Sequence, residues 1–216
     1  SMDLSGGNDT VVLEDMTSDV TPEDLNNVEN LHVQVASSST TLSLASAGDD
    51  VESVVVDANS MSITITDVDT VDTVAVSDAG TAMVTIEDVN SGNTVALTGS
   101  DNAKITGGST LTLNVSDVNA EVEIATTTTN TLTIDVADST DNAFDLVATA
   151  MTVLTVTGGG ALTISNEFGD TELADVTQID GSSATGAINV TVDGTTLTDV
   201  DTGSAGDMLH IKDSAA

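Results

Sequence analysis

The stretch Val51-Glu52-Ser53-Val54-Val55-Val56 indicates the fold, because the chain repeats its pattern on either side. The same formula, an apolar residue, an acid, a polar residue and then an apolar strand, occurs at Val28-Glu29-Asn30-Leu31-His32-Val33 and at Val71-Asp72-Thr73-Val74-Ala75-Val76. Plainer alternating strands lie between the copies, at Thr41-Leu42-Ser43-Leu44 and Ser62-Ile63-Thr64-Ile65. The repeating unit is therefore two short strands per turn of about 20 residues.

The same rhythm continues along the chain. The alternation of apolar and polar residues predicts strands centred near 54, 64, 75, 85, 96, 105, 113, 123 and 133, and then less evenly to about 210. A turn with two short strands cannot bury its apolar face alone, whereas stacked turns form a continuous thin core. We therefore expect an all-β fold, a parallel β-helix or β-roll solenoid with two strands per turn of ~20 residues. Spacing alone also fits tandem β-sandwiches, which remain the alternative.

The chain reads as one continuous domain. Residues 1–30 are expected to form an N-terminal edge turn with a short helix as a cap. Thr21-Pro22-Glu23-Asp24 has the order of a helix N-cap, a first-turn proline and two first-turn acids. This order predicts a helix near 22–27. Residues 31–216 are expected to form the solenoid, with an inserted loop or seam near 165–185. Ser1-Met2 resembles a cloning remnant, and we expect the chain to be a piece of a longer protein.

Composition excludes several classes of partner. The chain has 36 acidic and two basic residues in 216, a formal charge of −34, and no cysteine. Such a surface repels phosphate, so nucleic acid and anionic membranes are poor partners. No apolar stretch approaches the roughly 18 residues of a spanning helix, and the absence of cysteine excludes disulfides and thiolate metal sites. Aromatic residues make up 1% of the chain, which fits a thin core of small aliphatic side chains.

Carboxylates cluster where strands end, so stacking of the turns would align them along edges of the solenoid. Oxygen ligands from Asp, Asn and corner carbonyls are those that Ca²⁺ takes. We therefore expect structural Ca²⁺ sites that relieve the repulsion and join neighbouring turns, against the alternative of a solvated acidic surface. The candidate ligands are Asn8, Asp9, Asp49, Asp50, Asp67, Asp69, Asp78, Asp88, Asp101, Asp117, Asp199, Asp201 and Asp207.

Three further segments carry a resemblance to known proteins. Gly6-Gly7-Asn8-Asp9 and Gly203-Ser204-Ala205-Gly206-Asp207 look like degenerate copies of the glycine-rich nonapeptide of Ca²⁺-binding β-rolls. The string Asp175-Val176-Thr177-Gln178-Ile179-Asp180-Gly181-Ser182-Ser183-Ala184-Thr185-Gly186-Ala187-Ile188-Asn189-Val190 resembles the repetitive portions of Gram-negative S-layer proteins related to the RTX exoproteins. The resemblance implies a secreted, Ca²⁺-dependent lattice protein on the cell surface, exported by a type I system.

Catalysis finds little support in the residues. His32 and His210 are the two histidines, His32 alternates outward in its strand, and no Ser/His/Asp grouping or phosphate loop occurs. Paired carboxylates leave a polysaccharide-active β-helix enzyme as a rival, but the chain has no Trp, Tyr or Arg to line a sugar cleft. We therefore expect a non-enzymatic protein.

The leading hypothesis is a calcium-stabilised structural segment of a self-assembling bacterial surface layer. Its partners would be lattice neighbours of the same kind and, for parts outside this segment, cell-surface polysaccharide. An adhesin or biofilm-matrix module is the alternative, and halophily is a second explanation of the acidity.

Overall fold

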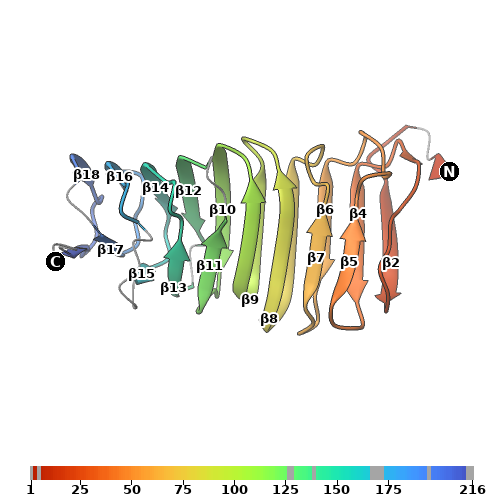
Figure 1. Ribbon diagram of the computed structural model, residues 1–216, viewed down its shortest axis with the longest axis horizontal. Coiled ribbons are helices and arrows are strands. Elements are labelled where there is room, and N and C mark those ends of the chain that lie inside the picture. The colour runs from red at the N-terminus through yellow and green to blue at the C-terminus, as the bar shows by residue number, and fades with distance from the viewer. Residues whose placement is uncertain are drawn as a thin grey trace.

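A computed structural model of the chain describes residues 2–3, 6–125, 129–137, 140–165, 173–193 and 196–212. The protein is an elongated solenoid with its two termini at opposite ends (Figure 1). Every named pair of strands is parallel, and the chain completes about nine turns. The prediction of a parallel β-solenoid is confirmed, and parallel pairing excludes the alternative of tandem β-sandwiches, whose sheets are antiparallel.

The described residues form strands and no helix. Their bounds are β1 Met2–Asp3, β2 Thr10–Met16, β3 Leu25–Asn26, β4 Asn30–Val35, β5 Thr40–Ser43, β6 Ser53–Asp57, β7 Ile63–Thr66, β8 Thr73–Val89, β9 Thr94–Gly107, β10 Thr110–Ser116, β11 Glu121–Ile124, β12 Thr131–Val136, β13 Asn142–Val147, β14 Val153–Gly158, β15 Leu162–Ser165, β16 Gln178–Asp180, β17 Ile188–Asp193, β18 Asp199–Asp201 and β19 Met208–Lys212.

Two sides of the solenoid carry most of the strands. The first side stacks β2, β4, β6, the start of β8, the start of β9, β10, β12, β14, β16 and β18. The second side stacks β5, β7, the end of β8, the end of β9, β11, β13, β15, β17 and β19. Strands β8 and β9 run around the corner between the two sides. The predicted centres near 54, 64, 75, 85, 96, 105, 113, 123 and 133 all fall inside these strands.

The core is built from inward residues that stack on their equivalents one turn away. Leu31 pairs with Val54, Val54 with Val74, and Val74 with Val95, and each of the four is at most 2% exposed. Alternate residues of the same strands are half-buried or exposed, as in β4. The period-two sequence pattern thus becomes two surfaces, one apolar and shared by all turns, and one facing outward.

The turns are unequal in length. Val95 pairs with Leu113, whereas Leu154 pairs with the more distant Ile179, so the second of these turns contains the longer stretch of chain. The longer turn includes much of the predicted seam at 165–185, of which residues 166–172 lie outside the described residues. Among the described residues of that segment, Leu173 and Val176 are buried, so this part of the seam joins the core.

The predicted helix near 22–27 is wrong. Leu25–Asn26 is instead strand β3, which pairs in parallel with Met2–Asp3. The Asp24 and Leu25 amides donate to the Ser46 and Ala47 carbonyls at 2.8 Å, one turn away. These bonds to the next turn replace the bonds within a helix, because stacking buries Leu25 and a single helical turn would not. The structure finds no helix among the described residues that is long and apolar enough to cross a membrane.

Glycine is required where a corner turns closely over the preceding turn. Gly158 has φ of 93°, and a Cβ there would lie 2.1 Å from the Val136 carbonyl oxygen. Both the backbone angle and the contact exclude a side chain. Gly158 thus marks a corner of the solenoid.

Candidate functional site

One corner of the solenoid carries a column of acidic residues, which we call the corner column. Its members Asp9, Glu29, Glu52 and Asp72 each stand immediately before a strand of the first side, and the first residues of these strands pair with one another in turn. Backbone bonds join the acids directly: the Glu52 amide donates to the Glu29 carbonyl at 2.9 Å, and the Asp72 amide to the Glu52 carbonyl at 3.0 Å. Four carboxyl-bearing residues are therefore stacked at the strand separation of about 4.8 Å.

The first turn of this column is tied by side chains as well as backbone. The Asp9 amide donates to Glu29 Oε2 at 2.8 Å. Asn30 Nδ2 donates to the Asp9 carbonyl at 3.2 Å and also to Asn8 Oδ1. The predicted candidates Asn8 and Asp9 thus lie at the acidic corner, next to Glu29.

The corner column changes character at Asn93. The Thr94 amide donates to the Asp72 carbonyl and the Thr112 amide to the Asn93 carbonyl, so Asn93 follows Asp72 in the stack. Its side-chain nitrogen donates to the carbonyl oxygens of Val71 and Val68, the latter at 3.4 Å. Beyond Asn93 the column is apolar and consists of Leu111, Leu132, Leu154, Ile179 and Val200.

Asp67 and Asp88 form a second stack. Asp67 lies two residues after Ile65, and Asp88 lies two residues after its pairing partner Ile86. Both aspartates have positive φ, 60° and 63°. The nearby Asp69 accepts a bond from Asn90 Nδ2 on its carbonyl oxygen at 2.6 Å.

The carboxylate of Asp67 is held by two hydroxyl groups. Its Oδ2 accepts hydrogen bonds from Thr66 Oγ1 at 2.7 Å and from Ser43 Oγ at 2.8 Å. These two bonds, that of Thr66 first, lower the pKa of Asp67 because they stabilise its ionised form. Asp67 is therefore present as a carboxylate, the form that a cation would bind.

Asp78 and Asp117 form a third stack, with a glycine between them. Asp78 follows Ser77 and Asp117 follows Ser116, and both serines pair with Thr98 of the intervening turn. Gly99 follows Thr98 and therefore occupies the equivalent position in that turn. All three have positive φ, 57°, 57° and 58°. The two carboxyl groups are therefore two turns apart at this corner.

Three candidates of the N-terminal and middle turns stand apart from these stacks. Asp49 and Asp50 are exposed in the loop before β6. Asp50 Oδ2 accepts a hydrogen bond from the Asn27 amide at 2.9 Å. Asp101 lies within β9, half-buried. The structure does not bring these residues into the corner column.

The last three candidates lie at the C-terminal end. Asp199 and Asp201 are exposed in β18, and Asp201 pairs with Asp180 of β16. Asp180 Oδ1 accepts bonds from Ser182 Oγ and the Ser182 amide, the first of which has the larger effect in lowering the pKa of Asp180. Asp207 Oδ1 accepts a bond from the Ile188 amide at 2.9 Å.

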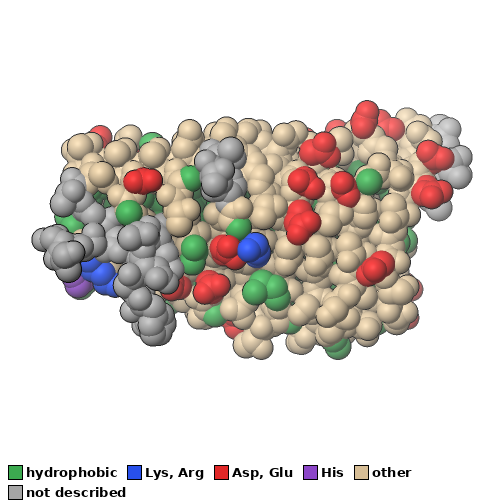
Figure 2. Space-filling view, in the orientation of Figure 1, with side chains coloured by type: hydrophobic (Ala, Val, Ile, Leu, Met, Phe, Trp, Pro, Cys, Tyr) green, Lys and Arg blue, Asp and Glu red, His purple; other side chains and the backbone are tan. Residues whose placement is uncertain are grey.

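The acidic stacks fit hard cations by donor type. Their oxygens are carboxylates and corner carbonyls, the ligands that Ca²⁺ prefers. Within the described residues, no three His, Asp or Glu side chains converge as in a preformed metal site. On the face that Figure 2 shows, acidic side chains are densest over the N-terminal half. Basic residues that could balance them are scarce: the chain has two, and Lys104 is paired with Glu123 at 2.9 Å on the second side.

The sequence-derived candidate set omits four residues that the structure places in or beside these stacks: Glu29, Glu52, Asp72 and Asp180. The first three had a clear signal, because each is the acid of the repeated formula. His32 and His210 are exposed in β4 and β19, and the outward orientation predicted for His32 is confirmed.

Comparison of the chain with protein-family models, with curated protein sequences and with solved structures finds no match.

Proposed function

We propose that this chain is a structural, calcium-stabilised segment of a secreted protein that assembles into a bacterial surface layer. The observation that carries the proposal is the corner column, in which Asp9, Glu29, Glu52 and Asp72 recur in register along an elongated solenoid. A rod of stacked turns is a spacer with repeated faces, which is what a lattice requires. We propose no catalytic activity for it.

The acidic half of the corner column is the proposed place of Ca²⁺ binding. Neighbouring carboxylates at about the strand separation repel one another, and a divalent cation held between them replaces repulsion by attraction. Glu29, Glu52 and Asp72 would supply carboxylate oxygens, and Asn8 and Asp9 would extend the set at the first turn. An ion that binds only the folded chain stabilises it by mass action.

Thermal unfolding tests this calcium proposal. We expect Ca²⁺ to raise the Tm of the wild-type chain at low salt and chelator to lower it again. The variant Glu29→Gln/Glu52→Gln/Asp72→Asn should lose most of this response. The control Glu14→Gln/Glu121→Gln/Asp141→Asn removes the same number of carboxylates at exposed positions elsewhere and should keep it.

Two results would contradict the calcium proposal. One is a wild-type Tm that is unchanged by Ca²⁺ and chelator at low salt. The other is equal stabilisation by high NaCl and by millimolar Ca²⁺, which would support halophily instead.

Electron microscopy tests the lattice part. The longer protein that contains this segment should form two-dimensional arrays with Ca²⁺ and lose them with chelator. Particles that stay single at all Ca²⁺ concentrations would contradict assembly. Binding to a defined glycan or receptor without arrays would support an adhesin.

A further inference from the structure

The outer surface of the first side carries a nearly uncharged strip along eight strands, which we call the threonine face. It consists of two adjacent columns, Thr10, Asn30, Ser53, Thr73, Thr94, Thr112, Thr133 and Thr155, and Val12, His32, Val55, Ala75, Ala96, Asn114, Asp135 and Thr157. Asp135 is the one carboxylate in these two columns, and its Oδ1 accepts a bond from Thr157 Oγ1 at 2.8 Å. The strip is thus almost neutral in a chain of charge −34.

Five consecutive turns present threonine in the first of these columns, from Thr73 to Thr155. All five are half-buried, and no hydrogen bond within the described part of the chain uses their hydroxyl groups. Each offers one methyl and one hydroxyl group at the strand spacing of about 4.8 Å. The column is therefore an even row of hydroxyl donors and acceptors that a partner surface can satisfy.

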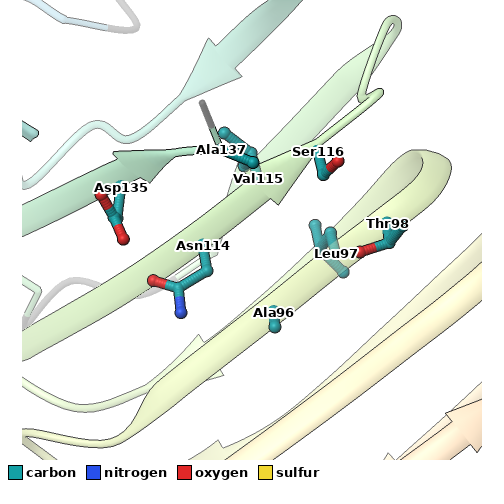
Figure 3. A pocket seen from close by; sticks show the side chains of 8 residues that line it. All are labelled: Ala96, Leu97, Thr98, Asn114, Val115, Ser116, Asp135 and Ala137. Carbon is teal, nitrogen blue, oxygen red and sulfur yellow. The ribbon is translucent and has the colours of Figure 1, made fainter. Parts of the chain in front are cut away.

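The second column adds exposed apolar groups and a hollow. Val12 and Val55 are 53% and 39% exposed. A hollow of about 230 Å³ opens farther along, lined by Ala96, Thr98, Asn114, Ser116, Asp135 and Ala137 among others. In Figure 3, Asn114 and Asp135 project side by side from neighbouring strands, next to the short Ala96. The face thus has both protruding valines and a recess.

We infer that the threonine face binds a second copy of this chain, face to face. Two molecules of charge −34 repel wherever their carboxylates approach, so close contact is cheapest where carboxylates are absent. An uncharged centre beside the acidic corner column has the usual anatomy of an interface, with charge at the rim. Because the same face is used on both copies, the contact is isologous and produces a closed dimer.

The size of the face indicates a weak contact. Eight strands at about 4.8 Å and two columns of side chains give roughly 34 Å by 14 Å, or about 475 Å² per copy. The total of about 950 Å² is below the ~1,200 Å² of stable complexes. A contact of this size is strengthened when a second contact tethers the copies. This inference rests on the proposed function, since it names one contact of the proposed assembly.

Sedimentation of paired variants tests the inference. Thr112→Asp/Thr133→Asp places two adjacent charges on the threonine face. Thr64→Asp/Thr85→Asp makes the same change at paired, half-buried positions of the second side and is the matched control. With Ca²⁺ present, the wild type and the control should shift to faster sedimentation as concentration rises, and the face variant should remain single. If the double variant unfolds, the single change Thr112→Asp against Thr85→Asp gives the same comparison.

Spin labels provide a second readout that does not depend on charge. The chain has no cysteine, so Ala96→Cys and Thr85→Cys can each carry one label. Concentration-dependent dipolar coupling between copies should appear for the label at Ala96 and be absent for the label at Thr85.

Three outcomes would overturn the inference. If the face variant assembles like the wild type, another surface joins the copies, and the proposed function stands without this contact. If the wild-type chain stays single with Ca²⁺, the inference fails, whereas the proposed function fails only if the longer protein also forms no arrays. If the wild type stays single but is retained on insoluble polysaccharide, and Thr112→Asp/Thr133→Asp abolishes retention, the face binds sugar rather than a second copy.

Discussion

The two halves of the corner column use the same position of the same sheet in opposite ways. Before Asn93 the residues are Asp9, Glu29, Glu52 and Asp72, all half-buried or exposed. After Asn93 they include Leu111, Leu132 and Leu154, none of which is exposed to solvent. The acids stand just before their strands begin, whereas these leucines are the second residues of β10, β12 and β14. One backbone arrangement therefore accepts either a charged rim or an extension of the core.

Exchanging the two kinds of residue should produce the greatest change in stability. Leu132→Asp places a carboxylate without a counter-ion in the apolar half, so we expect a loss of at least about 3–5 kcal/mol in the free energy of unfolding. The reciprocal change Glu52→Leu, at an exposed position, should alter it by less than about 0.5 kcal/mol. Urea unfolding followed by circular dichroism measures both. Equal losses in the free energy of unfolding for the two changes would show that the acidic and apolar halves do not differ in burial.

A smaller effect is expected at the junction. Asn93→Asp keeps the shape of the side chain but removes the amide that donates to the Val71 and Val68 carbonyls, and it directs a carboxylate at them. We expect a loss of about 1–3 kcal/mol by urea unfolding. Asn90→Asp, an exposed asparagine whose amide also bonds a carbonyl, is the control and should cost less than about 1 kcal/mol. If Asn93→Asp loses no more free energy of unfolding than Asn90→Asp, Asn93 does not stabilise the junction between the acidic and apolar halves.

Removing charge from the acidic half should raise stability when no divalent ion is present. For Glu29→Gln/Glu52→Gln/Asp72→Asn in chelator and low salt, we expect a Tm a few degrees above that of the wild type, because like charges no longer face one another. At about 1 M salt the Debye length falls to about 3 Å, and the difference should nearly vanish. Scanning calorimetry at two salt concentrations provides the measurement. A gain that persists unchanged in high salt would point to a cause other than repulsion.

The smallest effect concerns a carboxylate outside the corner column. The Thr66 and Ser43 hydroxyls lower the pKa of Asp67 in the folded chain, so their contribution to stability is fully present above the unfolded pKa and is lost as pH falls through the lowered folded value. Thr66→Val should raise the pKa of Asp67 toward its ordinary value. Carbon-detected NMR titration of Asp67 measures this shift. An identical titration in the variant would show that Thr66 does not act on this carboxyl group.

Much of the fold follows from the sequence because alternation and repeat length are both local signals. The positions of β6 to β12 and the inward residues Val54, Val74 and Val95 could be predicted in this way. The predicted helix near 22–27 failed because local capping preferences are weaker than the burial of Leu25 against the next turn.

The candidate site was less accessible to sequence reasoning. The turns differ in length, so no fixed period identifies which acids stack. Aspartates beside glycines, such as Asp49, have the composition of calcium-binding corners, whereas Glu52 and Asp72 read as parts of strands. The repeated formula aligns Glu52 with Asp72, and the pairing of Ser53 with Thr73 shows that these two acids are neighbours.

The parallel stacking of turns also has a mechanical consequence. The bonds between neighbouring turns run along the axis of the rod, so a pull on its two ends loads them one turn after another rather than all together. Each turn that peels away releases about 21 residues of chain, which is roughly 70 Å of extended length. A single-molecule stretching record should therefore show a series of small steps whose lengths follow the lengths of the turns. An ion that joins two turns should make them unfold together, in one larger step.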